Sequence, residues 1–451
     1  MRSHFATTFT VRPRCFEPMT PENVRRRRGE VRLRPSELVK NAISLMTSSV
    51  GTAVLGFVFW AVAARLQAPK FVGRASAEIA AMILLSSLSQ IGFGSTFERF
   101  LPIAGAATRR LVVRGYVLTT VIAAIISVGY LLLGFGHAFI EPTPTGRVVF
   151  VLASMGWTIF ALQDGVLIAL RSSRFVPLEN IVFSAFKLAL LPVMVSLSAS
   201  RGIYFAWIIP VVGALAGVNW YLFRHRIPEH ARVTADAPGL PPLREIATLA
   251  LGGYVTNILS IFLTSVVALI VIVRLGAVQS AYFYLPAMIA TALGQLLWNI
   301  NVSFLVESST TPDDMGDHIR STARITALIF VPSAVGGIIF APWILELFGA
   351  RYSHHGTTLL RMLLLAALGT VITEFYSTLM WLERRVWWLA AREFASLVIY
   401  LGVLLALISH LGINAAGVAA LSSSVLQAIF FLPYSIRRYR SATRPPAPVI
   451  P

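Results

Sequence analysis

The chain has 451 residues, of which 56% are hydrophobic and only 13% are charged, and its mean hydropathy is +0.73. Soluble domains usually carry about 25% charged residues, so this composition excludes a soluble globular protein and predicts an integral membrane protein. The net charge of +18 would suggest nucleic-acid binding in a soluble chain. Lys and Arg also accumulate in the cytoplasmic loops of membrane proteins, so we expect no nucleic-acid partner.

A basic tail of low hydrophobicity, residues 1–38, opens the chain and includes the run Arg25-Arg26-Arg27-Arg28. It has no continuous apolar stretch, so it does not resemble a secretory signal peptide. Its composition is typical of a disordered segment at the cytoplasmic face, and contact with anionic membrane lipids is a second interpretation. The only cysteine, Cys15, lies in this tail, which excludes an intramolecular disulfide.

Apolar runs long enough to cross a bilayer follow one another from residue 41 onward. A spanning helix takes about 20 residues. The alternating ten-residue segments of membrane β-barrels are absent, so the spans are predicted to be helices. We expect twelve spans, at about 41–64, 75–98, 112–136, 147–170, 178–199, 203–223, 247–273, 280–303, 325–348, 357–382, 386–408 and 415–435.

The distribution of positive charge predicts the orientation. The tails and the even-numbered connections hold 28 of the 38 Lys and Arg residues, the odd-numbered connections hold 7, and three lie within spans. Because Lys and Arg mark cytoplasmic loops, both termini are predicted to be cytoplasmic. We expect a multi-pass protein of the plasma (inner) membrane.

Charged residues at matching places in the topology recur at nearly one offset, which predicts duplication of a six-helix unit. The fold class is therefore predicted to be an all-α membrane protein with two six-helix lobes related by pseudo-twofold symmetry about an axis along the membrane normal. The predicted lobes are residues 39–223 and 245–436, with a cytoplasmic linker at 224–244 and a C-terminal tail at 437–451. The recurring pairs are Arg65 and Arg274 and Glu98 and Glu307, each 209 residues apart, and Arg110 and Arg320, Arg114 and Arg324, Asp164 and Glu374, and Arg174 and Arg384, each 210 apart.

Lys187 is the most informative charged residue inside a predicted span. It lies about nine residues into the fifth span, so about 14 Å deep, where snorkelling to the surface is difficult. Charged groups at such depth face a water-filled cavity or a partner. We expect a cavity-facing cation, with a buried structural ion pair as the alternative.

Acidic residues occupy three further spans. Asp164 and Glu374 lie at corresponding depths in the fourth and tenth spans and either serve a function or pair with a neighbouring cation such as Arg171 or Arg384. Glu78, near the outer end of the second span, either binds a coupling ion or contacts Arg74 or Lys70.

No metal-ligand spacing, nucleotide-binding loop or nucleophile–base arrangement is present, so we expect no metal, no cofactor and no enzymatic activity. Outer connections are short, the largest being residues 137–146. Lipid-linked glycan polymerases and glycosyltransferases with many spans usually need a substantial outer loop or domain, so this third class of function is disfavoured.

Two stretches resemble the polysaccharide flippase family of the multidrug/oligosaccharidyl-lipid/polysaccharide (MOP) exporter superfamily. The first is the opening pair of spans, with Ala64-Arg65-Leu66, Val72-Gly73 and Arg99-Phe100-Leu101-Pro102. The second runs from Gln163-Asp164-Gly165 through Arg171 to Val176-Pro177-Leu178-Glu179-Asn180 and is similar to the family's fourth and fifth spans.

The resemblance implies a transporter that moves a lipid-linked oligosaccharide, usually on an undecaprenyl-diphosphate carrier, from the inner to the outer leaflet by alternating access. Cations inside the cavity would bind the diphosphate, and the candidates are Lys187 and Arg392. First-span arginines often meet the substrate in related lipid flippases, which adds Arg65. A coupling proton or sodium ion would bind at Asp164, Glu374 or Glu78. The alternative within the superfamily is a multidrug or toxin extrusion antiporter, a class that typically exports organic cations.

Overall fold

The computed structural model describes residues 35–170, 172, 175–234, 240, 243–310, 315–383 and 385–443. Within them it describes no side chains for 35–50, 243–253, 255–257, 260, 306, 309–310, 386 and 439–443. The predicted N-terminal tail up to residue 34, the last eight residues and the proposed partners Arg171 and Arg384 lie outside the described residues. The chain divides into two units, Met1–Thr47 and Ser48–Pro451, and nearly all described residues belong to the second.

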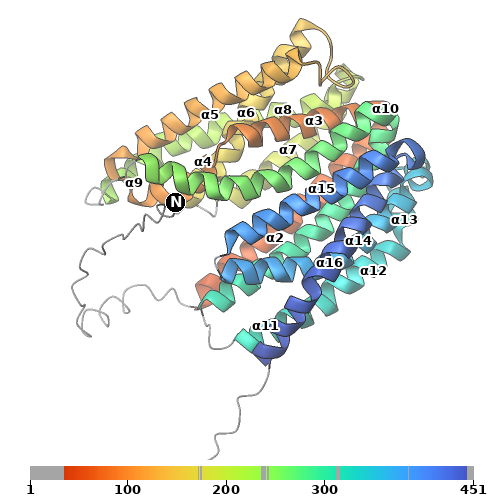
Figure 1. Ribbon diagram of the computed structural model, residues 1–451. Coiled ribbons are helices and arrows are strands. Elements are labelled where there is room, and N and C mark those ends of the chain that lie inside the picture. Colours follow the sequence, from red (N-terminus) through yellow and green to blue (C-terminus); the bar gives the residue numbers. More distant parts are fainter. Residues whose placement is uncertain are drawn as a thin grey trace, which may run out of the picture. The chain divides into compact units, whose positions relative to one another are not determined.

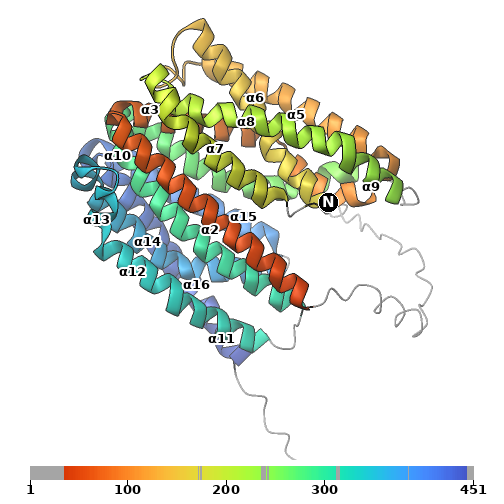
Figure 2. The same cartoon turned by 180° about the vertical axis from the view of Figure 1, so that it is seen from behind.

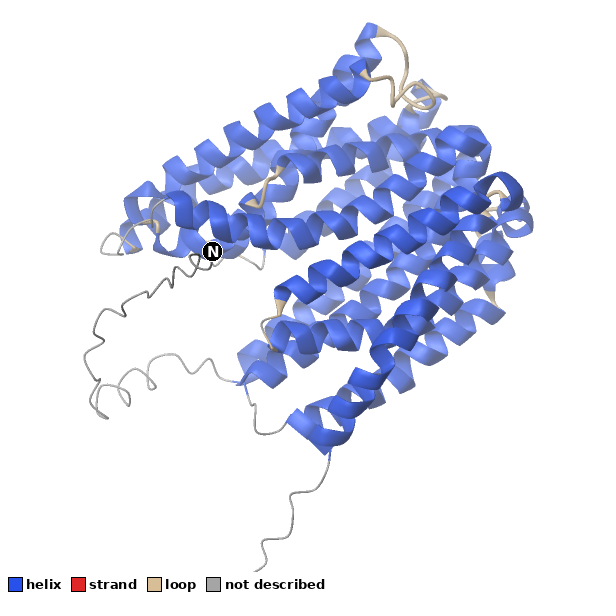
Figure 3. Ribbon diagram, in the orientation of Figure 1, coloured by secondary structure: helices blue, strands red, loops and turns tan. Residues whose placement is uncertain are grey.

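All regular structure in the described ranges is helical (Figures 1 to 3). The helices of the first half are α2 (Pro35–Leu66), α3 (Pro69–Ser89), α4 (Phe93–Phe100), α5 (Thr108–Leu132), α6 (Pro144–Ala169), α7 (Phe175–Leu197), α8 (Gly202–Tyr221) and α9 (Ile227–Val233). Those of the second half are α10 (Leu243–Thr310), α11 (Met315–Ile325), α12 (Val331–Ile339), α13 (Ala341–Glu346), α14 (Ala350–Leu382), α15 (Val386–Leu411) and α16 (Asn414–Thr443).

The number of membrane spans agrees with the prediction. Ten helical stretches in the described ranges are long and apolar enough to cross a bilayer, and one of them, Ile261–Leu305, has 45 residues. Since a span takes about 20 residues, this stretch provides two spans, divided where Gly276 leaves the helical conformation (φ 84°, ψ 174°). With the shorter apolar helix Gly51–Leu66, the described ranges hold twelve.

Proline marks the first turn of several helices. Pro69 and Pro144 occupy the opening positions of α3 and α6, where the missing N–H costs nothing because it would have no partner within the helix. At α6 the preceding Thr143 also caps the helix, since its side-chain oxygen accepts a hydrogen bond from the Gly146 N–H at 3.1 Å. Local sequence therefore sets where these spans begin.

Some boundaries differ from the prediction. A π-helical turn, Leu222–Arg226, carries α8 into α9, so the first half of the expected linker is helical. The expected ninth span, 325–348, is divided among the end of α11, a π-helical turn at Thr326–Phe330, α12 and α13. Helix α16 continues to Thr443, past the expected start of the C-terminal tail. The division into lobes at residues 223 and 245 stays a prediction.

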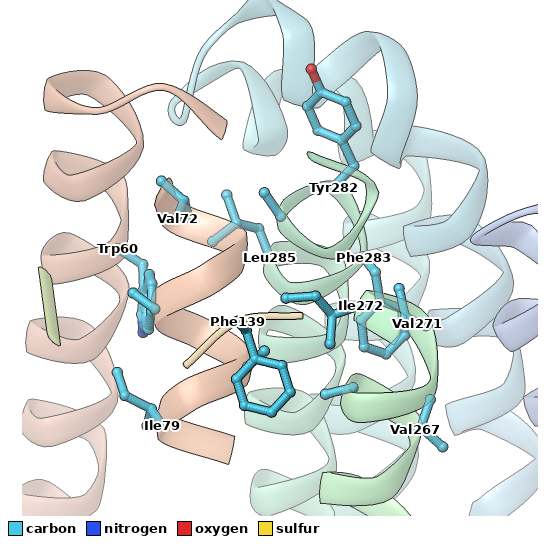
Figure 4. Close-up of a cluster of buried hydrophobic side chains, with 14 of the residues drawn as sticks. Trp60, Val72, Ile79, Phe139, Val267, Val271, Ile272, Tyr282, Phe283 and Leu285 are labelled. Carbon is cyan, nitrogen blue, oxygen red and sulfur yellow. The ribbon is translucent and has the colours of Figure 1, made fainter. Parts of the chain in front are cut away.

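The main hydrophobic core joins the first half of the chain to the second. Helix α3 packs along α10, and Figure 4 shows side chains from both, among them Val72 and Leu285. At Gly73 the two helices come so close that a Cβ atom would lie 1.8 Å from the carbonyl oxygen of Ala277. Val72 and Ala281, both buried at this crossing, are 209 residues apart, the spacing found in the sequence repeat.

Candidate functional site

The candidate site is a cavity of about 1000 Å³ that is lined by six helices, α2, α3, α6, α7, α8 and α10. The first five belong to the first half of the chain and α10 opens the second half. Two helical faces explain how the lining arises from the sequence. On α6 the lining residues are Trp157, Phe160, Ala161 and Asp164, and on α7 they are Asn180, Phe183, Ser184 and Lys187. Both sets follow the spacing i, i+3, i+4, i+7, which places them on one face of each helix.

Aromatic rings form much of the cavity surface. We call six of the lining rings the aromatic wall: Trp60, Trp157, Phe160, Phe183, Trp207 and Tyr284. Neighbouring ring centroids lie 4.6 Å apart for Trp60 and Tyr284, and 6.1 Å apart for Trp157 and Trp207. Such distances are typical of interacting aromatic pairs, so the wall is a continuous apolar surface for a flat or apolar ligand.

Lys187 lies in the cavity lining, as expected of a cavity-facing cation, and its side chain reaches the aromatic wall. The residue is 5% exposed. Its Nζ atom lies 3.9 Å from the Trp207 ring centroid, 5.0 Å from that of Phe183 and 5.4 Å from that of Phe59. Among the described residues no carboxylate oxygen lies within 4.0 Å of it. The buried ion pair that the sequence left open as an alternative is therefore not formed within the described part of the chain.

Asp164 is the other charged residue of the cavity lining. Asn180 of α7 lines the same cavity, and its side-chain amide donates a hydrogen bond to the Val176 carbonyl oxygen at 3.0 Å. The Asp164 Oδ1 atom is buried and has no hydrogen-bond partner among the described residues. A carboxylate with a free oxygen in a cavity has the chemistry to accept a proton or a cation, and that role stays a prediction.

A second polar group, formed by Gln163, Glu179 and Asn219, lies next to Asp164 in the fold, and the sequence analysis did not predict it. The Gln163 amide donates a hydrogen bond to the Glu179 carboxylate, and Asn219 Nδ2 donates to Gln163 Oε1 at 3.1 Å. Glu179 is 8% exposed, and its Oε2 atom has no partner among the described residues. Gln163 and Glu179 directly precede Asp164 and Asn180, and sequence neighbours do not share a helix face, so only the packing of α6, α7 and α8 reveals the group.

Glu78 is 5% exposed and lies in the lower-numbered half of α3, outside the cavity lining. Among the described residues its ion-pair partner is Arg201, which directly precedes α8, and not Arg74 or Lys70, the contacts that the sequence suggested. The Arg201 Nη2 atom lies 3.9 Å from Glu78 Oε1, and Nη1 lies 3.0 Å from Glu141 Oε2. These ion pairs tie together α3, α8 and the α5–α6 connection. The proposed ion-coupling role of Glu78 has no direct support in this geometry.

Glu374 and Arg392 form an ion pair in the second half of the chain. Arg392 Nη1 lies 3.6 Å from Glu374 Oε1, and the same guanidinium also pairs with Glu393. Neither residue lines the cavity. The sequence left open a functional role or an ion pair for Glu374, and the structure favours the ion pair. Arg392 was expected to bind substrate in the cavity, but it lies outside the cavity lining.

Arg65 also lies away from the cavity lining. At the last turn of α2, its guanidinium donates to the backbone carbonyls of Leu347 at 3.0 Å and Glu346 at 2.9 Å. These acceptors lie about 280 residues later in the chain, so Arg65 links the two halves. Its predicted substrate contact therefore stays a prediction that the geometry does not favour.

No family model matches the chain, and no curated protein sequence matches it. Solved structures do match. An inward-facing multidrug resistance MATE family transporter of the MOP superfamily is 15% identical, with 89% of this chain and 98% of that chain covered and a TM-score of 0.65. An outward-facing structure of a transporter of that family is 14% identical, with 90% and 96% covered and a TM-score of 0.61.

A third match is a MOP superfamily transporter from Pyrococcus furiosus, described as having a binding pocket of reverse polarity that suggests a different function. It is 15% identical, with 90% of this chain and 96% of that chain covered and a TM-score of 0.57. At these identities the likeness shows the fold. The expected all-α fold of about twelve membrane helices in two lobes is confirmed, and it is the fold of the MATE transporters of the MOP superfamily.

Proposed function

We propose that this protein is a membrane transporter that exports an amphipathic organic molecule by alternating access, in the manner of a multidrug or toxin extruder. The single observation that carries the proposal is the cavity itself. It is large, it is walled by aromatic rings, and its lining comes from both halves of the chain. A site between two halves can change its exposure when one half moves against the other, which is the physical basis of alternating access.

The volume favours a compact substrate. Sites for drug-sized ligands usually measure about 300–1000 Å³, and this cavity of about 1000 Å³ lies at the upper end of that range. A lipid-linked oligosaccharide brings a diphosphate, several sugar rings and a long prenyl chain, and most of it would have to lie outside such a cavity. Two of the solved structures that share this fold are described as multidrug resistance transporters, which also supports a compact substrate.

The second candidate is a flippase for a lipid-linked glycan, and two observations favour it. The cavity contains a cation, Lys187, which suits a diphosphate, and the sequence resembles the polysaccharide flippases. In this candidate an undecaprenyl-diphosphate carrier would cross from the inner to the outer leaflet of the plasma membrane, with both termini of the protein in the cytoplasm.

Coupling to a proton or sodium gradient is part of the proposal. Asp164 is the residue we assign to it, because its carboxylate lies at the cavity and has a free oxygen. Glu179, also with a free oxygen, lies in the adjoining polar group. Glu374 is less suited to the role because its carboxylate pairs with Arg392, and Glu78 is less suited because it lies outside the cavity lining.

Reconstitution into liposomes tests the proposal and separates the two candidates. We expect the purified protein to move an amphipathic fluorescent dye across the membrane when a proton or sodium gradient is imposed, and protein-free liposomes to move none. In parallel, the gene would be deleted in its host and lipid-linked oligosaccharide measured in the inner leaflet. Accumulation of a fully built lipid-linked unit, with no dye transport in liposomes, would replace the extruder proposal with the flippase.

A further inference from the structure

We propose that the cavity recognises an organic anion: a carboxylate, sulfonate or phosphate group bound at Lys187, with an apolar body lying on the aromatic wall. The inference rests on the proposed function only in taking the cavity as the substrate's binding site. It names the charge and the chemical class of that substrate, which the fold does not specify.

Lys187 is surrounded by aromatic rings and has no described carboxylate beside it. The ammonium lies over the Trp207 ring and within 5.4 Å of two further ring centroids, and aromatic faces stabilise a cation. Rings carry no net negative charge, so the positive charge of the site is not cancelled. A cation this deep in a membrane protein is costly without a counterion.

Other buried cations show the contrast. Arg201 meets Glu78 and Glu141, and Arg392 meets Glu374 and Glu393. Lys187 is only 5% exposed, yet no described carboxylate oxygen lies within 4.0 Å of its Nζ atom. Its open side faces the cavity, so the counterion of Lys187 can come from a ligand.

Trp207 provides a second, independent observation. Its indole N–H is buried and has no acceptor among the described residues, although buried N–H groups are nearly always paired. Both Lys187 and the indole N–H donate hydrogen bonds and neither accepts one. The ammonium lies over the Trp207 ring, and an oxygen of a ligand that reached the indole N–H would supply the acceptor that this group lacks. An oxyanion suits both groups because it has several acceptor lone pairs.

Asp164 does not reverse this polarity. It lines the same cavity, but it is not within ion-pair distance of Lys187. An organic cation lying on the aromatic wall at Phe183 and Trp207 would meet the Lys187 ammonium at close range. An organic anion there would meet an attractive charge.

Binding to the full-length protein in lipid nanodiscs tests the inference without any transport step. The probes are 1-naphthalenesulfonate, the neutral 1-naphthalenesulfonamide and the cationic 1-naphthylmethylammonium, which share one ring system. We expect the wild-type protein to bind the sulfonate at least tenfold more tightly than the ammonium. Lys187→Met should remove that preference, Lys187→Arg should keep it, and Lys70→Met, which removes an exposed lysine of α3, should change nothing.

A prenyl diphosphate, farnesyl diphosphate, forms a second arm. Lys187-dependent binding of either 1-naphthalenesulfonate or farnesyl diphosphate supports the inference. Tighter binding of the sulfonate indicates an aryl acid as the natural ligand, and tighter binding of the diphosphate indicates a lipid phosphate. Equal binding of sulfonate and ammonium by the wild-type protein, or tighter binding of the ammonium, overturns it. So does an unchanged sulfonate affinity in Lys187→Met. If Lys187→Met does not fold, the comparison of sulfonate and ammonium binding by the wild-type protein still tests the inference.

The two proposals fail separately. Lys187-dependent binding of anions in nanodiscs together with inactive proteoliposomes would remove the transporter and leave the anion site. Robust dye transport together with equal binding of anion and cation would remove the anion site and leave the transporter.

Discussion

Gly73 provides a quantitative test of how the two halves of the chain are joined. Gly73→Ala adds a Cβ atom 1.8 Å from the carbonyl oxygen of Ala277, 2.8 Å from its carbonyl carbon and 2.9 Å from the Ala281 nitrogen. Ordinary contact begins at 3.4 Å, so α3 and α10 would have to separate by about 1.6 Å, the difference between the two distances. The obstacle is backbone, which no change of side-chain rotamer can move aside.

The cost of this substitution follows from overpacking. Extra atoms forced into a well-packed core cost about 1–3 kcal/mol, and a backbone clash belongs at the upper end of that range. The assay is thermal unfolding of the detergent-purified protein, followed by the fluorescence of its nine tryptophans. We expect Gly73→Ala to lower both the unfolding temperature and the yield of folded protein.

Gly294→Ala is the matched control, since it lies in α10 and its added Cβ would meet no atom within 4 Å. Ala is favoured over Gly in a helix interior by about 0.5–1 kcal/mol, so this variant should be as stable as the wild type or slightly more stable. Equal stability of Gly73→Ala and Gly294→Ala would refute the close crossing of α3 and α10.

Three further predictions concern the charged residues. Arg392→Met leaves the Glu374 and Glu393 carboxylates without their shared cation, so we expect the unfolding free energy to fall by about 3–5 kcal/mol. A triple variant that also changes both glutamates to Gln should recover most of this loss. Arg65→Leu removes two charged hydrogen bonds to backbone carbonyls at an exposed site, so thermal unfolding should show a smaller loss, about 1 kcal/mol. Asp164→Asn should bind the ligand but no longer couple its movement to an ion gradient, which flux measurements at several gradient strengths would reveal.

The sequence alone predicted the features that depend on composition and on the spacing of residues along a helix. Apolar run length predicted twelve spans, and the depth of Lys187 along its span predicted its place at a cavity. Helix faces also follow directly, since Asn180, Phe183, Ser184 and Lys187 share one face of α7 by spacing alone. Each of these features is determined within a single helix.

Features that depend on which helices are neighbours could not be predicted. Arg392 and Arg65 have the same residue chemistry as a cavity cation, yet one meets two carboxylates and the other reaches carbonyls about 280 residues away. The sequence around Trp207 did not indicate that it lines the cavity. A tryptophan in an apolar span has the same neighbours in sequence whether it faces lipid, the hydrophobic core or a cavity. Arg201 was likewise missed as the partner of Glu78, since it lies between predicted spans.

The central claim is that the cavity is the path of a transported molecule, and blocking it with one side chain is the most direct measurement. Gly56 lines the cavity with no atom within 4 Å of an added Cβ, so Gly56→Trp places an indole ring in the open space. Gly402 is exposed on α15 and has equally open surroundings, so Gly402→Trp is the control. In proteoliposomes we predict that dye flux falls at least tenfold in Gly56→Trp and is unchanged in Gly402→Trp. Equal flux in the two variants, both folded, would contradict the claim.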